Sequence, residues 1–166
     1  ADHGDGCNIH PPAKQFCGAR LGKSALALQY EQPIPWKSPT YKNAKAVNQS
    51  SKPSVQIYFH DDVQPGGGLY LLDNPYNNRL DPATFSCKKQ PPGICAGAMV
   101  LLNGKGWVNA SISLIPPTSS VVFTAAEGDS TDTIVATSYG WGAVPMMTIY
   151  DKSTNLPVLP WKEKIA

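Results

Sequence analysis

Apolar and polar residues alternate with a period of two along most of the chain after Ser54. Successive side chains of a β-strand point to opposite faces, so this period predicts strands with one buried face. The residues predicted to face inward are Val55, Ile57 and Phe59, then Leu69 and Leu71, then Ala98, Val100 and Leu102, then Val108, Ala110, Ile112 and Leu114, and finally Val121, Phe123 and Ala125. The pattern favours a core built on sheets.

Turn-forming residues separate these runs. Asn103-Gly104 is typical of a hairpin turn, and Pro116-Pro117 ends the run before it because proline cannot donate to a strand ladder. Further strands are expected in the last third of the chain, up to a short edge strand at 158–161. About eight short strands at a spacing of roughly ten residues, without a long helix, predict an all-β fold. We therefore expect a single domain over residues 1–166, an antiparallel β-sandwich or barrel.

The N-terminal third lacks this regularity. Residues 1–22 are polar and contain several glycines and prolines, which predicts an irregular arm. Residues 23–31 fit either a strand or a short helix, and we predict a strand from the alternation of Leu26, Leu28 and Tyr30. Four prolines within residues 32–53 predict an extended surface loop.

Four cysteines fall in two local pairs. Three pairings are open to four cysteines, and we favour Cys7 with Cys17 and Cys87 with Cys95, because closing a short loop costs little chain entropy. The first pair would tie the N-terminal arm. Disulfides persist in oxidising compartments, so the pattern predicts a secreted or surface-exposed protein.

Charge excludes some partners. The net charge is +2, from 14 basic and 12 acidic residues without long runs of one sign, so we expect no nucleic-acid partner. No stretch approaches the roughly 20 apolar residues of a membrane span, so we expect no membrane insertion. Ala1 opens into polar sequence without a signal peptide, and a secreted chain would therefore be the mature form. Glycosylation sequons begin at Asn48 and at Asn109, and the strand pattern places Asn109 toward solvent.

The first three residues could hold a metal. A free amine at Ala1, the backbone amides of Asp2 and His3 and the His3 imidazole supply four nitrogens in a square plane, which suits Cu(II) or Ni(II). The site requires Ala1 to be the processed N-terminus. A histidine also occurs at position three by chance.

A second candidate metal site lies in the segment from Asp73 to Asp81. Two carboxylates and three amides within nine residues could hold Ca²⁺, with Asp73, Asn77 and Asp81 as ligands. The order of these residues resembles the metal-and-sugar loop of legume lectins, which implies a carbohydrate contact from Asn77 and Asn78. The acidic strand that those lectins pair with this loop is absent. Asn and Asp also cap ordinary turns.

Three aromatic residues are candidates for a carbohydrate-binding face. Glycines flank Trp141 and precede Trp107, and Tyr139 is expected on the same strand face as Trp141. Exposed rings beside amides and hydroxyls suit a sugar, because its C–H surface stacks on a ring. The alternative is that these rings pack in the core or cover it.

The sequence Tyr58-Phe59-His60-Asp61 ends a predicted strand. A histidine beside carboxylates could serve as a general base, although an exposed histidine with a turn-capping Asp explains the same residues. The tetrapeptide resembles a strand of the dirigent proteins, secreted barrels that guide radical coupling. Their later segments are absent, so no function follows from it. No GxSxG motif occurs, and catalysis has no support in the sequence.

These observations predict a secreted, non-enzymatic binding module that recognises a glycan or a cell-surface ligand, as lectins and adhesins do. No cofactor is expected beyond the two candidate metals. One alternative is a self-associating structural subunit of a pilus, coat or matrix. A second alternative is a secreted inhibitor or toxin component whose loop between Cys87 and Cys95 inserts into a partner.

Overall fold

The computed structural model describes residues 14–47, 51–60, 67–72, 95–115 and 119–165. In these ranges the chain forms one helix and eleven strands, so the prediction of an all-β barrel or sandwich is confirmed. Within the same ranges, no helix is long and apolar enough to cross a membrane.

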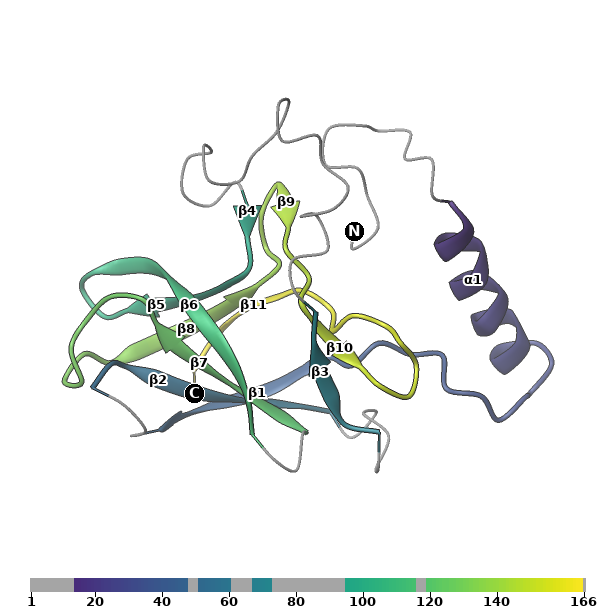
Figure 1. Ribbon diagram of the computed structural model, residues 1–166, viewed down its shortest axis with the longest axis horizontal. Helices are drawn as coiled ribbons and strands as arrows, with labels where there is room; N and C mark the ends of the chain where they lie inside the picture. The colour runs from purple at the N-terminus through teal and green to yellow at the C-terminus, as the bar shows by residue number, and fades with distance from the viewer. Residues whose placement is uncertain (1–13, 48–50, 61–66, 73–94, 116–118, 166) are drawn as a thin grey trace.

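Seven strands form one antiparallel sheet (Figure 1). Its order across the sheet is β1 (Tyr41–Val47), β2 (Ser54–Phe59), β7 (Ser120–Ala125), β6 (Gly106–Ile115), β5 (Ala98–Leu102), β8 (Ile134–Tyr139) and β11 (Trp161–Lys164). The two edge strands lie close together. Tyr41 of β1 stacks on Trp161 of β11, with ring centres 5.4 Å apart. The sheet is therefore nearly closed into a barrel.

Two small strand pairs complete the β structure. β3 (Leu69–Leu71) pairs antiparallel with β10 (Ile149–Asp151). β4 (Cys95–Ala96) pairs with β9 (Val144–Pro145), and this pair is parallel. The expectation of a purely antiparallel structure therefore holds for the large sheet and fails for this short pair.

The alternation locates the core correctly. Nearly all residues predicted to face inward are buried or pack against the core, and the exception is Leu71, which is 38% exposed. The predicted hairpin is also present: β5 and β6 pair on either side of a turn at Asn103-Gly104. Gly104 has a φ of 73°, which glycine adopts without strain. Asn109 is exposed, as predicted.

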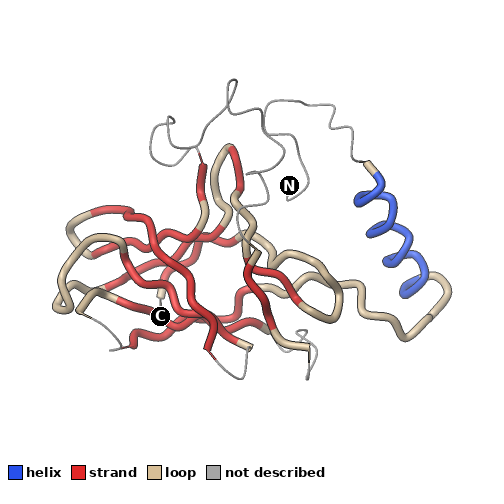
Figure 2. The backbone as a smooth tube through the Cα atoms, viewed as in Figure 1, coloured by secondary structure: helices blue, strands red, loops and turns tan. Residues whose placement is uncertain are grey.

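The N-terminal segment differs from the prediction. Helix α1 (Gln15–Leu28) replaces part of the irregular arm and most of the strand predicted over 23–31. Its Ala, Leu, Lys, Arg and Gln residues are good helix formers, and their propensity outweighs the two-residue alternation. No residue of α1 is buried, and Figure 2 shows the helix set apart from the strands.

Two strand predictions also need correction. β1 lies inside the predicted surface loop, because the four prolines of that segment fall outside Tyr41–Val47. The final strand was predicted over 158–161, but β11 begins at Trp161, where pairing with β8 starts. Pro157 and Pro160 restrict the backbone just before it.

The disulfide prediction fails for the first pair. Cys17 is a free, exposed cysteine on α1, so no disulfide joins it to Cys7 and the arm is not tied in this way. Cys95 on β4 is disulfide-bonded. Cys7 and Cys87 lie outside the described residues, and the pairing of Cys87 with Cys95 stays a prediction.

Candidate functional site

Open cavities lie at several places on the described surface. One of about 220 Å³ separates α1 from the turn after β10, with Phe16 and Leu156 among its walls. Another of about 450 Å³ lies beside Asp132. The Asp132 carboxylate already forms an ion pair with Lys105 at 2.8 Å and accepts a hydrogen bond from the Asp129 backbone N–H at 2.8 Å. The polar chemistry of that cavity is therefore largely satisfied within the protein.

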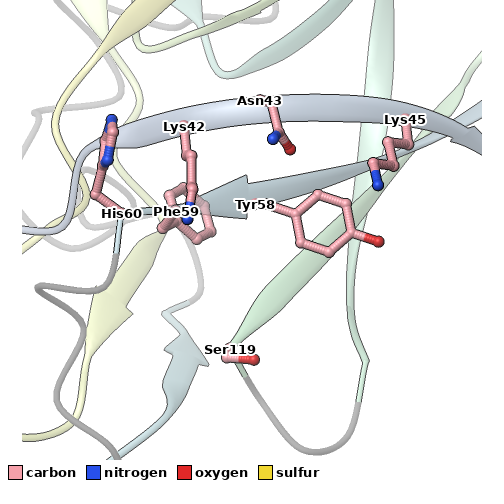
Figure 3. A pocket seen from close by; sticks show the side chains of 7 residues that line it. All are labelled: Lys42, Asn43, Lys45, Tyr58, Phe59, His60 and Ser119. Atoms are coloured by element: carbon pink, nitrogen blue, oxygen red, sulfur yellow. The ribbon is translucent and has the colours of Figure 1, made fainter.

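A third cavity, of about 250 Å³, is lined by charged, polar and aromatic side chains (Figure 3). It lies on the outer face of β1 and β2. The residues that line it are Lys42, Asn43, Lys45, Tyr58, Phe59, His60 and Ser119. It combines two ammonium groups, an imidazole, an amide, two hydroxyls and two aromatic rings, and we take it as the candidate functional site.

A β-bulge in β1 builds one wall of this cavity. Tyr41 pairs with Phe59 and Asn43 pairs with Tyr58, so Lys42 is the extra residue of the bulge. Tyr41 still faces inward and stacks on Trp161. Lys42 and Asn43 are both exposed as a result, although they are adjacent in sequence. Bulges commonly redirect side chains beside functional sites in this way.

Strand β2 builds the opposite wall by regular alternation. Phe59 is 6% exposed and belongs to the core, while Tyr58 is half-buried and His60 is exposed. The next strand fixes the position of β2: the Gln56 side chain donates a hydrogen bond to Ser120 Oγ at 2.9 Å. Tyr58 and His60 are thereby held at the cavity on the barrel surface.

The described lining residues of the cavity carry basic and neutral groups. None of its described lining residues is acidic. Lys45 Nζ lies 5.7 Å from the centre of the Tyr58 ring, within the range of a cation–π contact. This contact brings a positive charge close to the apolar face of the ring.

Ser119 and His60 are the described lining residues whose side chains could form a nucleophile and base. Acyl transfer by a serine needs a base within hydrogen-bond reach of the hydroxyl. Figure 3 shows Ser119 and His60 in separate parts of the cavity, with the Ser119 hydroxyl directed away from the imidazole. The arrangement can therefore hold a ligand by charge, stacking and hydrogen bonds.

The three predicted aromatic residues do not form one binding face. Tyr139 is fully buried, and its hydroxyl accepts hydrogen bonds from the backbone N–H groups of Thr148 and Ile149 at 2.6 and 2.7 Å. Its expected place on an exposed face is therefore wrong. Trp141 is 58% exposed, and Trp107 is half-buried under the Lys162 ammonium, 5.2 Å from the ring centre.

The predicted metal ligands lie elsewhere in the chain. Ala1, Asp2 and His3, the candidate copper or nickel site, are outside the described residues, as are Asp73, Asn77, Asn78 and Asp81 of the candidate calcium loop. In the described ranges, no group of three His, Cys, Asp or Glu residues could hold a metal ion. Both metal sites stay predictions.

Sequence reasoning found one wall of the cavity and missed the other. The sequence predicts Tyr58 and His60 at the end of a strand, with His60 as a candidate base. It places Lys42, Asn43 and Lys45 in a predicted surface loop. The alternation of apolar Ala44 with polar Asn43 and Lys45 was the available signal.

Comparisons with known proteins are sparse. No protein-family model and no curated protein matches the chain. Among solved structures, the chain is similar to a carbohydrate acetylesterase from Xanthomonas citri, with a TM-score of 0.66 and 19% sequence identity. The match covers 98% of this chain and 31% of the esterase, so the chain spans about a third of that protein's length. At this identity, the likeness shows the fold.

This comparison overturns the prediction of a non-enzymatic binding module. The fold that was expected to belong to a lectin-like or adhesin-like protein matches part of an enzyme across nearly the whole chain. The same finding counts against the structural subunit and the inhibitor or toxin component. The prediction of a carbohydrate ligand is compatible with the likeness to a carbohydrate acetylesterase.

Proposed function

We propose that this chain is a β domain of a carbohydrate esterase and that its outer cavity holds the carbohydrate. The observation that carries the proposal is the fold likeness to a carbohydrate acetylesterase over 98% of the chain. The match covers only 31% of that enzyme, so the likeness shows the fold of this chain. The ester-cleaving activity is proposed along with the binding of carbohydrate.

The cavity supports a role in holding the sugar. The Tyr58 ring provides an apolar surface, while Asn43 and Ser119 provide an amide and a hydroxyl beside it. Sugars bind through this combination, since their C–H faces stack on rings and their hydroxyls exchange hydrogen bonds.

An extracellular setting is also part of the proposal. The disulfide at Cys95 supports it, because disulfides persist outside reducing compartments.

The test is acetate release from acetylated oligosaccharides by the purified intact protein, compared between wild type and Tyr58→Ala. We expect saturable release, with a raised KM and a retained kcat in the variant, because the ring contributes binding. A matched control is Tyr30→Ala, which removes a ring that is 72% exposed and does not line the cavity. Absence of release would overturn the esterase proposal. Release with an unchanged KM in Tyr58→Ala would overturn the role of the cavity.

A further inference from the structure

We propose that helix α1 is an interface element, and that the side of it turned away from the strands binds the catalytic part of a carbohydrate esterase. This inference rests on the proposed function and names the partner that the β domain meets. It comes from the distribution of charged and apolar side chains around α1.

The charged side chains of α1 lie toward the strands. Arg20 and Lys23 line the cavity of about 220 Å³ between the helix and the turn after β10, together with Tyr150 and Leu156. At about 3.6 residues per turn, the opposite side of Gln15–Leu28, here called the outward face, carries only uncharged residues, namely Gly18, Leu21, Gly22, Ala25 and Leu28. A surface helix normally has the reverse arrangement, with its apolar side against its own domain. The outward face is therefore suited to contact with another surface.

The shape of the outward face also suits close packing. Leu21 is 70% exposed and Leu28 is 59% exposed. A Cβ added at Gly18 or Gly22 would lie in open space, with nothing else within 4 Å. Small residues allow a short distance between packed elements, and the leucines beside them can fill the grooves of a partner.

The helix lacks features that would stabilise it alone. It has 14 residues, none of them buried, and Lys14 at its N-cap forms no capping hydrogen bond through its side chain. Its first turn has no acidic residue and its last turn has no basic residue. Helices of this length are marginal in water, and each interior glycine costs about 1 kcal/mol relative to alanine. Packing of the outward face against a partner would supply stabilisation that the helix itself does not provide.

The fold comparison favours one partner. The likeness to the carbohydrate acetylesterase covers 98% of this chain, which is too much for the 14-residue helix to lie outside the match. It covers 31% of the esterase, so most of that polypeptide lies beyond the matched part. The partner of the outward face is the corresponding remainder of an esterase, on the same polypeptide or on a separate one.

The test is photo-crosslinking in cells that produce the protein, with benzoylphenylalanine at position 25, in the middle of the outward face. The same group at position 113 is the control, because Ser113 is an exposed residue of β6. Peptide mass spectrometry identifies the crosslinked peptide, and acetate release from acetylated oligosaccharides is measured on the same preparation. We expect position 25 to crosslink to a peptide outside residues 1–166, in a preparation that releases acetate, and position 113 to yield far less of this product.

Charge placed on the outward face should break the contact. Leu21→Glu combined with Leu28→Glu should reduce the crosslinked product about tenfold, because carboxylates would be buried without partners. Both leucines are exposed in this chain, so its unfolding midpoint should stay nearly unchanged. Leu159→Glu is the matched control, since Leu159 is 45% exposed and lies outside α1, and it should leave the crosslink intact.

The outcomes separate this inference from the proposed function. Acetate release without a crosslink from position 25 would overturn the role of α1 and leave the esterase proposal standing. Crosslinks between two copies of this chain, or to a protein without esterase activity, would also overturn it, as would an equal loss of crosslinking in Leu159→Glu. Absence of acetate release from every preparation would overturn the proposed function itself.

Discussion

The indole N–H of Trp161 donates a hydrogen bond to Thr137 Oγ1 at 3.0 Å, and both residues are buried inside the barrel. Trp161 begins the edge strand β11, while Tyr41, on which it also stacks, begins β1 at the other edge. Trp161 therefore joins the two ends of the large sheet through its side chain. Its ring also stacks on Tyr139, with centres 4.9 Å apart.

Replacing Trp161 by Ala should strongly destabilise the fold. Trp161 is 5% exposed, and the loss of a buried tryptophan typically costs about 3–5 kcal/mol. In a domain of this size we expect the midpoint of thermal unfolding to fall on the order of 10 °C. Trp141→Ala is the matched control, because this ring is 58% exposed and should leave the midpoint nearly unchanged. Equal losses in the two variants would contradict the proposed closure of the barrel.

The turn after β10 depends on one carboxylate. Asp151 is 1% exposed, and its Oδ2 accepts hydrogen bonds from Ser153 Oγ at 2.6 Å, Thr154 Oγ1 at 2.6 Å and the Thr154 backbone N–H at 3.0 Å. Burial alone would raise the pKa of Asp151. The hydrogen bonds from Ser153 and Thr154 outweigh this effect, so the pKa lies below its usual value.

Asp151→Ala should therefore destabilise the protein in a pH-dependent way. At neutral pH we expect a loss of about 2–3 kcal/mol, because several donors lose a charged acceptor. Since the folded pKa is lowered, the stabilisation is present above the unfolded pKa of about 3.9 and is lost as pH falls through the folded pKa. Urea unfolding of both proteins at neutral pH and near pH 3 should show the gap narrowing in acid. A gap that widens in acid would refute this account.

Gly140 directly follows β8, at a position that leaves little room for a side chain. Its φ is 60°, and a Cβ there would lie 2.6 Å from Met147 Sδ, in a side chain that is 1% exposed. Gly140→Ala should cost about 1–3 kcal/mol in urea unfolding. Gly22→Ala gives the contrast, because nothing lies within 4 Å of its Cβ and alanine favours the helix. A loss of stability in Gly22→Ala similar to that in Gly140→Ala would count against this explanation.

The two described cysteines should react differently. Cys17 is free and exposed, whereas Cys95 is disulfide-bonded. Alkylation of the native protein without reductant, followed by peptide mass spectrometry, should modify Cys17 and leave Cys95 unmodified. Reduction before alkylation should expose Cys95. Modification of Cys95 without reductant would contradict the structure.

The sequence located the strands whose alternation reflects burial. Val100 and Phe123 could be placed because one face of each strand packs in the core. Helix α1 escaped prediction because Leu21 and Leu28 are exposed at 70% and 59%, so no tertiary burial shapes its pattern. The cavity could not be predicted, since its lysine wall depends on a bulge whose position requires the register between β1 and β2.

The bulge itself can be removed without moving the core. Deletion of Lys42 would place Tyr41 next to Asn43 and convert the present pairing with Phe59 and Tyr58 into a regular antiparallel ladder. Tyr41 would still face inward, so we expect an unfolding midpoint within a few degrees of wild type and a raised KM for acetylated oligosaccharides. Deletion of Lys45 is the matched control. It lies in a regular part of the strand, where removing one residue turns the flanking side chains to the wrong face, including the buried Ala44. Thermal unfolding should therefore show a much larger loss for the second deletion. If deletion of Lys42 proved equally destabilising, the bulge would serve the fold, and its interpretation as a device for ligand binding would fail.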